Sequence, residues 1–552
     1  MLAEAFDEEV KTFCQSAELV PELPFRLDLL GLYVQFIERK YDIYQKEKFQ
    51  VPSNNVVAIE QRKRDLKSMR DDHQLLALKL LLTEEQVAQF QNNGQYTFSA
   101  KELTRVGIVQ VSYEGKLHFV HRTFAEYYVA DFLVNLLTEG SNTSQQVQDL
   151  LLQEIFLKNY YRIIRAFIDG LLSRTKAPKA VLRQYGHRMS NLEDGVPVLH
   201  EAAREGNANI VEFLLDSLQA GEYKDARNEL LLARDHYERT AWHLAAERGN
   251  TELLETIWKL AKQKLKTEEI RNKLLLGIIK GNRTAWQKAA NKCKIHVLEK
   301  LWEWSREELT PEELKNKLFL AKCLLGRTAW QDAAMRGNTD FLDKVWEWVK
   351  KEVTPDEFCH KLLLGIDLTG TTVWHNTVQW GNVELLEKLW EWAKQKLTPG
   401  KLKYQVLLGK SGWKENAWHM AAESGNVELQ EKVWEWANET LTSDELNNKL
   451  LLGKDNKKRT AWHLAAEQGN VESLEKLWRW AKEKLTPDKL KNELLFARVR
   501  DKNAFKTAWD VAAGQGKKEV LLKLYDWAAD VLTPAEMRSM SSFIKKRLNI
   551  IN

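Results

Sequence analysis

Apolar residues recur at helical spacing within a unit that is restated along the second half of the chain. In the copy that begins at Thr460, the apolar positions of residues 471–485 follow one side of a helix. Thr460 is a good N-cap for a shorter helix over residues 461–467, and Gly469 is typical of a helix end. The pattern predicts a short helix followed by a longer one.

A third helix is predicted where Thr486 caps and Pro487 takes the first helical position. The same Thr-Pro signal opens at residues 310–311, 354–355, 398–399 and 533–534. On the second helix, Trp478 and Trp480 stand two positions apart and point to nearly opposite sides, so both sides must be covered. We expect the third helix to provide the outer cover.

The tryptophans mark a fixed repeat. One series has 44 residues between neighbours until a last gap of 47, and consists of Trp242, Trp286, Trp330, Trp374, Trp418, Trp462 and Trp509. A second series follows sixteen residues later, from Trp258 to Trp478, and a third follows two residues after that, from Trp304 to Trp527. A fixed period of this length indicates a stacked array whose units cannot bury their apolar faces alone.

Composition narrows the function classes. With 82 Lys and Arg against 78 Asp and Glu, the net charge of +4 gives no reason to expect nucleic acid or an acidic membrane as partner. Four cysteines without CxxC spacing suit a reducing compartment and predict neither metal sites nor disulfides. No apolar stretch approaches the roughly 20 residues needed to cross a bilayer. We therefore expect a cytoplasmic protein without a cofactor or metal.

The first copy of the repeat resembles a known family. Gly195, the run Leu199-His200-Glu201-Ala202-Ala203 and the pair Gly206-Asn207 closely resemble the ankyrin pattern G-x-T-P-L-H-x-A-A-x-x-G-N. The later copies look like a derived ankyrin form of 44 residues, with Ala-Trp in place of Pro-Leu and an added Thr-Pro helix. The resemblance covers residues 190–552, ending in a capping helix, and implies an array that binds other proteins.

The N-terminal third carries a second resemblance. The sequence from Phe119 to Leu133, FVHRTFAEYYVADFL, looks like the end of the winged-helix domain in NACHT ATPases of the NOD-like receptor type. A helix over residues 98–103 and two strands over residues 108–111 and 117–119 are predicted in the expected order. The resulting domains are a helical segment (1–75), a winged-helix-like domain (76–137), a helical linker (138–189) and the array.

The NACHT resemblance lacks a phosphate loop. Such a domain needs an upstream G-x-x-x-x-G-K-[ST] pattern, and the run Gly409-Lys410-Ser411 has Tyr404 in place of the first glycine. We interpret this run as a chance match. In the family, the histidine at the position of His121 reaches the β-phosphate of ADP. Within this chain His121 is expected to be a partly buried structural histidine, and a nucleotide contact only if the chain is the C-terminal fragment of a longer receptor.

Catalytic and nucleic-acid functions are weaker alternatives. The run from His200 to Arg204 misses the H-E-x-x-H metalloprotease pattern at its last position. One histidine occurs in each of five repeats, at His200, His243, His375, His419 and His463. Gln287, Gln331 or Asp510 replaces it in other copies, which predicts a hydrogen-bonding framework role. Basic residues in the winged-helix-like segment are interleaved with glutamates, so nucleic-acid binding is the lesser alternative.

Partner contacts are predicted in the loops that join each third helix to the next repeat, because these loops vary between copies and rigid scaffolds carry specificity in loops. Trp380 and Trp413 lie outside the three tryptophan series and are the candidate anchors, unless they fold back onto their own repeats. The other candidate contacts are Asp235, His236, Tyr237, Lys414, Lys457 and Lys458.

The sequence therefore predicts a mainly α fold, an α-solenoid of ankyrin-like repeats preceded by a helical region and a small winged-helix domain. The predicted function is non-enzymatic: a protein-protein interaction scaffold or sensor, which the NACHT resemblance links to innate-immune or stress signalling. The alternative is the C-terminal part of a nucleotide-switched NACHT-type ATPase.

Overall fold

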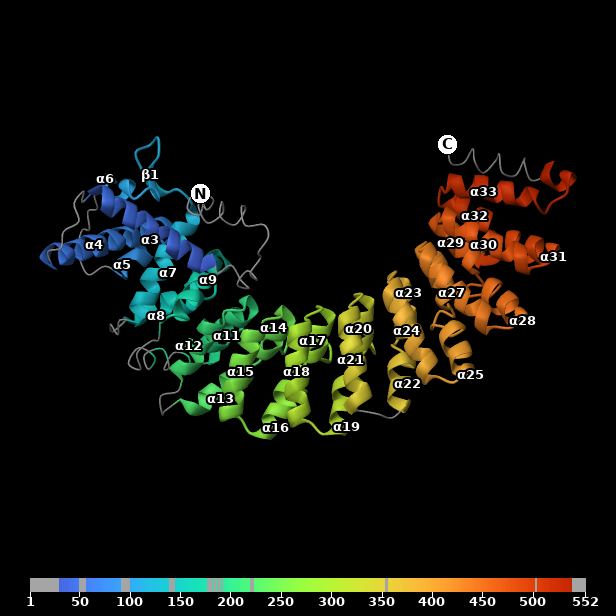
Figure 1. The fold of residues 1–552 in the computed structure, drawn as a ribbon, viewed down its shortest axis with the longest axis horizontal. Helices are drawn as coiled ribbons and strands as arrows, with labels where there is room; N and C mark the ends of the chain where they lie inside the picture. Colours follow the sequence, from blue (N-terminus) through green and yellow to red (C-terminus); the bar gives the residue numbers. More distant parts are fainter. Residues whose placement is uncertain are drawn as a thin grey trace, which may run out of the picture. The chain divides into compact units, whose positions relative to one another are not determined.

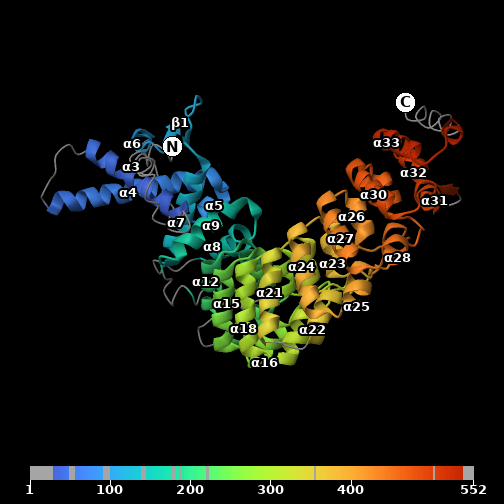
Figure 2. The same cartoon turned by 45° about the vertical axis from the view of Figure 1, so that its right-hand side comes forward.

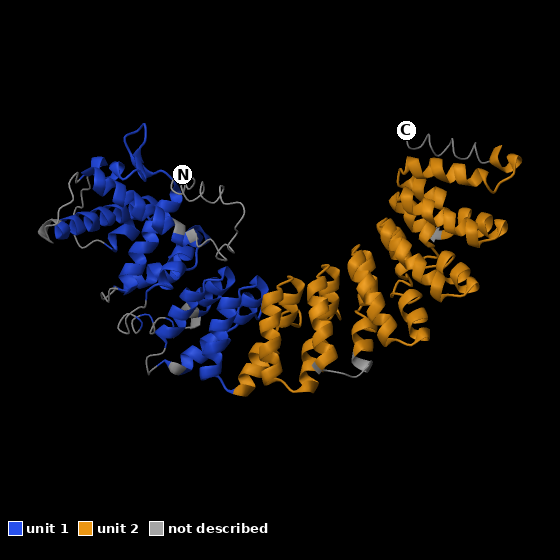
Figure 3. Ribbon diagram, viewed as in Figure 1, with its two compact units in different colours: residues 1–266 blue, residues 267–552 orange. Residues whose placement is uncertain are grey.

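The computed structural model describes residues 29–48, 56–90, 100–138, 144–175, 192–218, 223–352, 356–501 and 504–538, together with residues 182, 185 and 189. Within these residues the chain is an array of helices with three two-stranded hairpins (Figure 1). It is the mainly α, solenoid-type repeat array that the sequence predicts. The chain divides into two compact units, residues 1–266 and residues 267–552 (Figure 3). The predicted domain boundaries at residues 75, 137 and 189 all fall inside the first unit.

The N-terminal part of the first unit is built around helix α7. Its elements are α3 (Leu29–Lys48), α4 (Val56–Leu81), α5 (Glu84–Ala88), α6 (Ala100–Arg105), β1 (Val109–Val111), β2 (Leu117–Phe119) and α7 (Arg122–Thr138). Most residues of α7 are buried, and the helix packs against α4 and against α9 (Arg162–Leu172). A hydrogen bond of 2.9 Å joins the buried hydroxyls of Tyr41 and Tyr128, and so ties α3 to α7.

The two-stranded hairpin predicted for this region is present. Strands β1 and β2 are antiparallel, with Val109 opposite Phe119. The predicted helix over residues 98–103 is described from Ala100 onward, as α6. Of the helical segment predicted over residues 1–75, residues 1–28 and 49–55 lie outside the described residues. The winged-helix assignment of residues 76–137 stays a prediction.

The rest of the first unit consists of stacked helices. They are α8 (Gln145–Asp149), η1 (Leu150–Ile155, π-helical), η2 (Asn159–Tyr161, 3-10), α9, α11 (Leu192–Glu205), α12 (Ala208–Ser217), α13 (Lys224–Leu232), α14 (Ala241–Arg248) and α15 (Thr251–Lys264). Helix α9 packs on α12, and η1 packs on α11. Residues 144–172, expected to be a linker, thus lie directly against the first repeat.

The second unit repeats one arrangement of helices. Its elements are α16 (Thr267–Glu269), η3 (Ile270–Leu275), β3 (Ile278–Ile279), β4 (Arg283–Thr284), α17 (Ala285–Asn291), α18 (Ile295–Glu308), α19 (Pro311–Glu313), η4 (Leu314–Phe319), α20 (Ala329–Met335), α21 (Thr339–Glu352), α22 (Asp356–Leu364), α23 (Val373–Gln379), α24 (Val383–Lys396), α25 (Pro399–Lys401), η5 (Leu402–Leu407), α26 (Ala417–Ser424), α27 (Val427–Thr440), α28 (Ser443–Glu445), η6 (Leu446–Leu451), α29 (Ala461–Gln468), α30 (Val471–Lys484), α31 (Pro487–Lys489), η7 (Leu490–Leu495), β5 (Val499–Asp501), β6 (Ala504–Lys506), α32 (Ala508–Gly514) and α33 (Lys518–Ala529).

Each repeat pairs a short first helix with a longer second helix, and successive repeats lie side by side. The first helices α17, α20, α23, α26, α29 and α32 pack one against the next. The second helices do the same, and both views show α24, α27 and α30 in succession (Figures 1 and 2). The structure describes the predicted capping helix only as far as residue 538. At the start of this segment, the N–H of Thr533 donates a 2.9 Å hydrogen bond to Glu536.

The histidines of the repeats have the framework role that the sequence predicts. Nδ1 of His463 accepts hydrogen bonds from Thr460, at 2.9 Å from the hydroxyl and 3.4 Å from the backbone nitrogen. Nε2 lies 3.0 Å from the carbonyl oxygen of Ala497, which can only accept, so this nitrogen carries the proton. Gln287 makes the equivalent contact by donating from Nε2 to the carbonyl of Ala321 at 2.8 Å. The side chain thus joins the start of the first helix to the end of the third.

The prediction that the third helix covers the outer side of the second helix is only partly correct. Trp480 stacks on Trp434 of the preceding repeat, with ring centroids 4.9 Å apart and an interplanar angle of 15°. Trp478 instead contacts Trp462 of its own repeat and Trp527 of the next. The two tryptophans point in opposite directions along the array because each neighbouring repeat covers one side. The third helix contributes in the repeat of Phe319, whose ring contacts Trp286 and Trp302.

The third helix begins as an α turn and usually ends as a π turn. In η7 the N–H of Phe496 donates to the carbonyl of Lys491, five residues earlier, at 3.0 Å. A glycine follows the π turn in three repeats, at Gly277, Gly409 and Gly453. A Cβ at Gly409 would lie 2.2 Å from the carbonyl oxygen of Gln405, so the backbone approaches closely there. Ala321 and Ala497 hold the same position after η4 and η7, so the turn can also form around an alanine.

Candidate binding surface

The loops that precede the first helices of the second unit are joined into one row. They comprise residues 278–284, 322–328, 366–372, 410–416 and 454–460. A backbone hydrogen bond links each loop to the next: Leu324 N to Gly281 O (3.0 Å), Leu368 N to Leu325 O (3.1 Å), Gly412 N to Thr369 O (2.8 Å) and Asn456 N to Trp413 O (3.0 Å). We call this row the loop ridge. Its loops hold one another in place and are not independent.

Glycines allow the neighbouring loops to approach so closely. Gly326 and Gly370 have φ angles of +71° and +70°. A Cβ at Gly326 would lie 2.9 Å from the backbone nitrogen of Leu368, and one at Gly370 would lie 2.6 Å from that of Gly412. A larger residue at either position would therefore push two loops apart.

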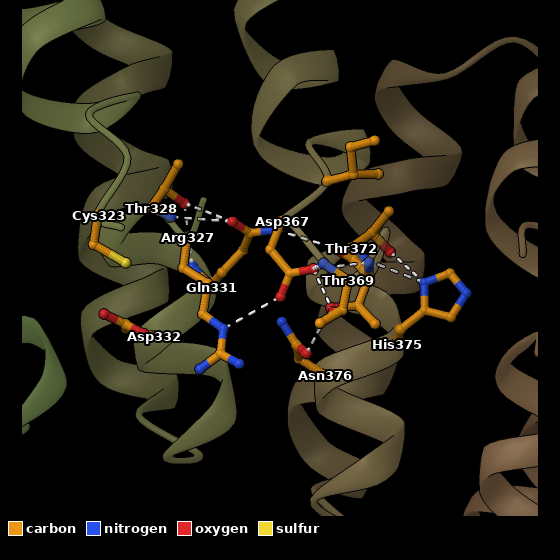
Figure 4. Close-up of polar contacts among 12 residues, drawn as sticks. Cys323, Arg327, Thr328, Gln331, Asp332, Asp367, Thr369, Thr372, His375 and Asn376 are labelled. Atoms are coloured by element: carbon orange, nitrogen blue, oxygen red, sulfur yellow. Dashed lines mark hydrogen bonds and ion pairs between the residues drawn. The ribbon is translucent and has the colours of Figure 1, made fainter. Parts of the chain in front are cut away.

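A buried carboxylate organises the loop at residues 366–372 (Figure 4). Oδ1 of Asp367 accepts hydrogen bonds from the backbone N–H groups of Thr369 (2.9 Å) and Thr371 (3.0 Å). Its Oδ2 accepts one from Nε of Arg327 in the preceding repeat, at 3.2 Å. Burial acts to raise the pKa of Asp367, but the hydrogen bonds outweigh burial and hold it below its ordinary value. The loop is thus fixed both internally and to its neighbour.

The residues that stand at the position of Asp367 in other repeats show why Arg327 pairs with an aspartate of the following loop. Asp455 has its arginine in the same loop, with Nε of Arg459 at 2.7 Å from Oδ2. In the loop of Arg327 the corresponding position is Cys323, which offers no carboxylate, so this arginine pairs with Asp367. In this pair of repeats the arginine of one loop is therefore bound by the aspartate of the next.

Large apolar side chains project from the loop ridge. Leu368 is 75% exposed, Leu324 is 69% exposed and Trp413 is 56% exposed. Ile278, Leu325 and Ile366 are also exposed. Single exposed apolar residues are ordinary, but a set gathered on one rigid feature marks an interaction site.

The charged side chains that point outward from the loop ridge are basic. Its exposed lysines are Lys280, Lys322, Lys410, Lys414, Lys454, Lys457 and Lys458. The acidic residues of the same loops turn inward: Asp367 and Asp455 are buried, and Glu415 pairs with Arg459 at 3.1 Å. The ridge therefore presents apolar side chains within a positive field.

The structure separates the two predicted tryptophan anchors. Trp413 lies on the ridge, with Lys414 beside it and Lys457 and Lys458 in the next loop. Trp380 is 60% exposed but follows the C-terminal end of α23, whereas the ridge loops lie at the N-terminal ends of the first helices. Both tryptophans are exposed, so neither is folded back into its repeat. They cannot form one small patch.

The predicted contacts of the first unit form a separate group. The rings of His236 and Tyr237 have centroids 3.9 Å apart, and the guanidinium of Arg239 lies 4.9 Å from the Tyr237 ring. The carboxylate of Asp235 is turned into its loop, where it accepts hydrogen bonds from the backbone nitrogens of Tyr237 and Arg239. Asp235 thus shapes the loop, and His236 and Tyr237 are the exposed members of the group.

Sequence reasoning missed Leu324 and Leu325. Their loop, Cys323-Leu324-Leu325-Gly326, continues the leucine-rich end of the third helix, so its apolar residues looked like part of the core. The signal that could have found them is the 44-residue register, which aligns Leu324 with Leu368 and places both in a turn that ends in glycine.

The features that suggested nucleotide binding have structural explanations. His121 is exposed, not partly buried as predicted, because it precedes α7 at the surface. Its Nδ1 accepts a hydrogen bond from the backbone N–H of Thr123 at 3.2 Å and so helps to begin that helix. Gly409 follows a π turn, at a position that glycine or alanine fills in the other repeats. Within the described part of the chain, no group of three His, Cys, Asp or Glu side chains is arranged to hold a metal ion.

Comparison with protein families finds ankyrin repeats in one part of the chain. Residues 133–268 match the family model of ankyrin repeats (3 copies). Ankyrin repeats are interaction modules, so the match supports a general role in protein-protein interaction. The matched segment includes residues 144–172, which pack on the first repeat, and it stops before most of the tryptophan-rich copies. A search of curated proteins found no significant match.

The described helices were also assessed as membrane spans. None of them combines the length and the apolar character that crossing a bilayer requires.

Proposed function

We propose that the repeat array is a non-enzymatic binding module that contacts a protein partner through the loop ridge. The observation that carries the proposal is the gathering of exposed Leu324, Leu368 and Trp413 on loops that are hydrogen-bonded to one another. A rigid, pre-formed surface loses little conformational freedom on binding, which favours affinity.

The chemistry of the ridge defines the class of partner. Burying a leucine side chain contributes about 1.5–3 kcal/mol, so two or three apolar anchors suffice for a specific contact. The lysines around them favour an acidic partner surface and raise the rate of association at low salt. The partner is thus a protein with apolar side chains set among Asp or Glu residues.

A pair of matched variants tests this surface. Leu324→Ser combined with Leu368→Ser removes two exposed apolar groups without altering a buried contact of the array. Leu522→Ser is the control, because Leu522 is also exposed but lies on α33, away from the ridge. Proteins captured from cells by the unaltered chain and by each variant are compared by quantitative mass spectrometry, with far-UV circular dichroism as the check on folding.

We expect a partner that is lost with the ridge variant and kept by the control. A partner bound through the ridge should also dissociate as salt is raised, and less steeply after Lys457→Glu with Lys458→Glu. Retention of every partner by the ridge variant, or equal loss in the control, contradicts the proposal.

Innate-immune or stress signalling, a cytoplasmic location and a NACHT-type fragment remain predictions from the sequence. The family match and the geometry of the ridge add nothing to these three assignments. They therefore play no part in the design of the experiment.

A further inference from the structure

A polar pocket of about 400 Å³ lies in the first unit. Three of its lining residues are arginines from three different helices: Arg162 at the start of α9, Arg204 near the end of α11 and Arg248 at the end of α14. Asn159 and Asn250 add amide groups to the lining. The convergence of guanidinium groups from separate helices is a feature that repeat stacking alone does not require.

The walls of the pocket are fixed by close packing of two turns. Nδ2 of Asn250 donates a 2.6 Å hydrogen bond to the carbonyl of Gly206. Gly206 has a φ of +87°, and a Cβ there would lie 2.6 Å from Nδ2 of Asn250. The turns that carry Arg204 and Arg248 are therefore held at a set separation.

The carboxylates near the pocket are already engaged. Glu205 accepts a bidentate pair from the buried Arg165, at 2.7 Å from Nε and 2.6 Å from the terminal nitrogen. Glu201 accepts a hydrogen bond from Arg204. The lining itself holds three arginines and one glutamate, so the pocket has an excess of positive charge.

Two of the arginines are available to a ligand. The side chain of Arg162 is 67% exposed, and the carboxylate of Glu205 approaches its Nε only to 3.9 Å. Arg248 is exposed and, among the described residues, has no ion pair. Both present several N–H donors toward solvent at the mouth of the pocket.

We infer that this pocket binds a phosphate monoester, carried on a phosphorylated serine or threonine of a protein partner. A phosphate dianion offers three acceptor oxygens and close to two negative charges, which matches several guanidinium groups converging from different directions. A carboxylate has two oxygens in one plane and one charge, so it would satisfy only part of this donor set. The pocket does not depend on the loop ridge, which lies in the other unit.

Calorimetric titration of the full chain at low salt tests the inference with four probes. They are a phosphoserine pentapeptide flanked by glycines, the same peptide with unmodified serine, the same peptide with glutamate, and inorganic phosphate. The phosphopeptide is expected to bind, the serine peptide not to bind, and the glutamate peptide to bind at least tenfold more weakly. Binding of inorganic phosphate without binding of the phosphopeptide overturns the assignment to a phosphorylated side chain.

Variants locate the binding in the pocket. Arg248→Gln and Arg162→Gln should each weaken phosphopeptide binding about tenfold or more, because a hydrogen bond to a charged group is lost. Arg248→Lys keeps the positive charge but loses the planar guanidinium group that can donate two parallel hydrogen bonds. It should therefore weaken phosphopeptide binding by an intermediate factor. Arg336→Gln is the matched control, because Arg336 also stands before a Gly-Asn pair at the end of a first helix, in the second unit.

The inference is overturned if Arg336→Gln weakens phosphopeptide binding as much as the pocket substitutions do. It is also overturned if binding is unchanged after both pocket substitutions. Failure of the phosphopeptide to bind at all does the same. None of these results bears on the loop ridge, whose variants lie in the other unit.

Discussion

Trp346 stacks on Trp392 of the following repeat, with ring centroids 4.7 Å apart and an interplanar angle of 14°. Trp330 contacts both, at 6.3 Å and 5.7 Å. The three tryptophan series of the sequence thus meet as triads, each built from two repeats. This sharing explains why one repeat cannot bury its tryptophans alone.

Loss of a tryptophan from a triad should destabilise the second unit. Trp346 is 3% exposed, and replacing a buried aromatic residue by alanine costs about 3–5 kcal/mol. We expect Trp346→Ala to lower the urea midpoint in unfolding followed by circular dichroism. Trp380→Ala is the control and should change the free energy of unfolding by no more than about 0.5 kcal/mol, because its side chain is exposed. Similar losses in both variants would contradict the triad model.

Glycine substitutions test the π turn at the end of the third helix. Gly409→Ala should destabilise the chain by about 1 kcal/mol, because its Cβ would meet the carbonyl of Gln405 and the turn must shift to a backbone that admits alanine, as at Ala321 and Ala497. Gly400→Ala, in α25 of the same repeat, has no atom within 4 Å of the new Cβ and should stabilise by about 0.4–1 kcal/mol. We expect the two substitutions to change the free energy of unfolding in urea in opposite directions. A neutral Gly409 variant would show that the backbone there can relax.

Helices and caps could be predicted from the sequence because their signals are local. Thr460 and the apolar spacing of residues 471–485 determine an N-cap and a buried helix face within one repeat. The direction of Trp480 could not be predicted, because its partner Trp434 belongs to another repeat. The π turn was also missed, since buried Leu490 and Leu494 fit an α-helix equally well.

The candidate site was predictable as a set of loops but not as a surface. Variation between copies pointed to the loops of Trp413 and Lys457. It could not show that backbone hydrogen bonds join these loops, nor that Trp380 lies at the other end of the first helices. Those relationships depend on how repeats stack, which no single repeat encodes.

Acid should weaken the array through its buried histidines. Burial lowers the pKa of His463 to about 4 from its ordinary value of 6.5, although the hydrogen bond to Ala497 opposes the shift. Between pH 6.5 and 4 the unfolded chain gains a proton that the folded chain does not, so stability falls as pH falls through this window. At 1.36 kcal/mol for each pKa unit, the loss is about 3 kcal/mol for one such histidine. Above pH 6.5 the contribution is constant.

Replacing His463 by glutamine should reduce this pH dependence of stability and keep the structure of the repeat. Gln287 makes the same two contacts in its own repeat, so His463→Gln should unfold like the parent at pH 7.5 and lose less stability by pH 4.5. His296→Gln is the control, because His296 is exposed on α18. The measurement is urea unfolding at a series of pH values. An unchanged pH profile in the His463 variant would show that other groups cause the acid sensitivity.

Asp367 should stabilise two loops of the ridge at once, because its carboxylate accepts from its own loop and from Arg327 of the preceding repeat. Asp367→Ala leaves that arginine and two N–H groups without their acceptor, and we expect a loss of about 3 kcal/mol. Hydrogen exchange should accelerate at the amides of Thr371 and Gly412, the second of which lies in the next loop. Asp343→Ala removes an exposed inter-repeat pair with Lys388 and should cost at most about 1 kcal/mol. Unchanged exchange at Gly412 would mean that the loops move independently, and a partner would then have to order them one by one.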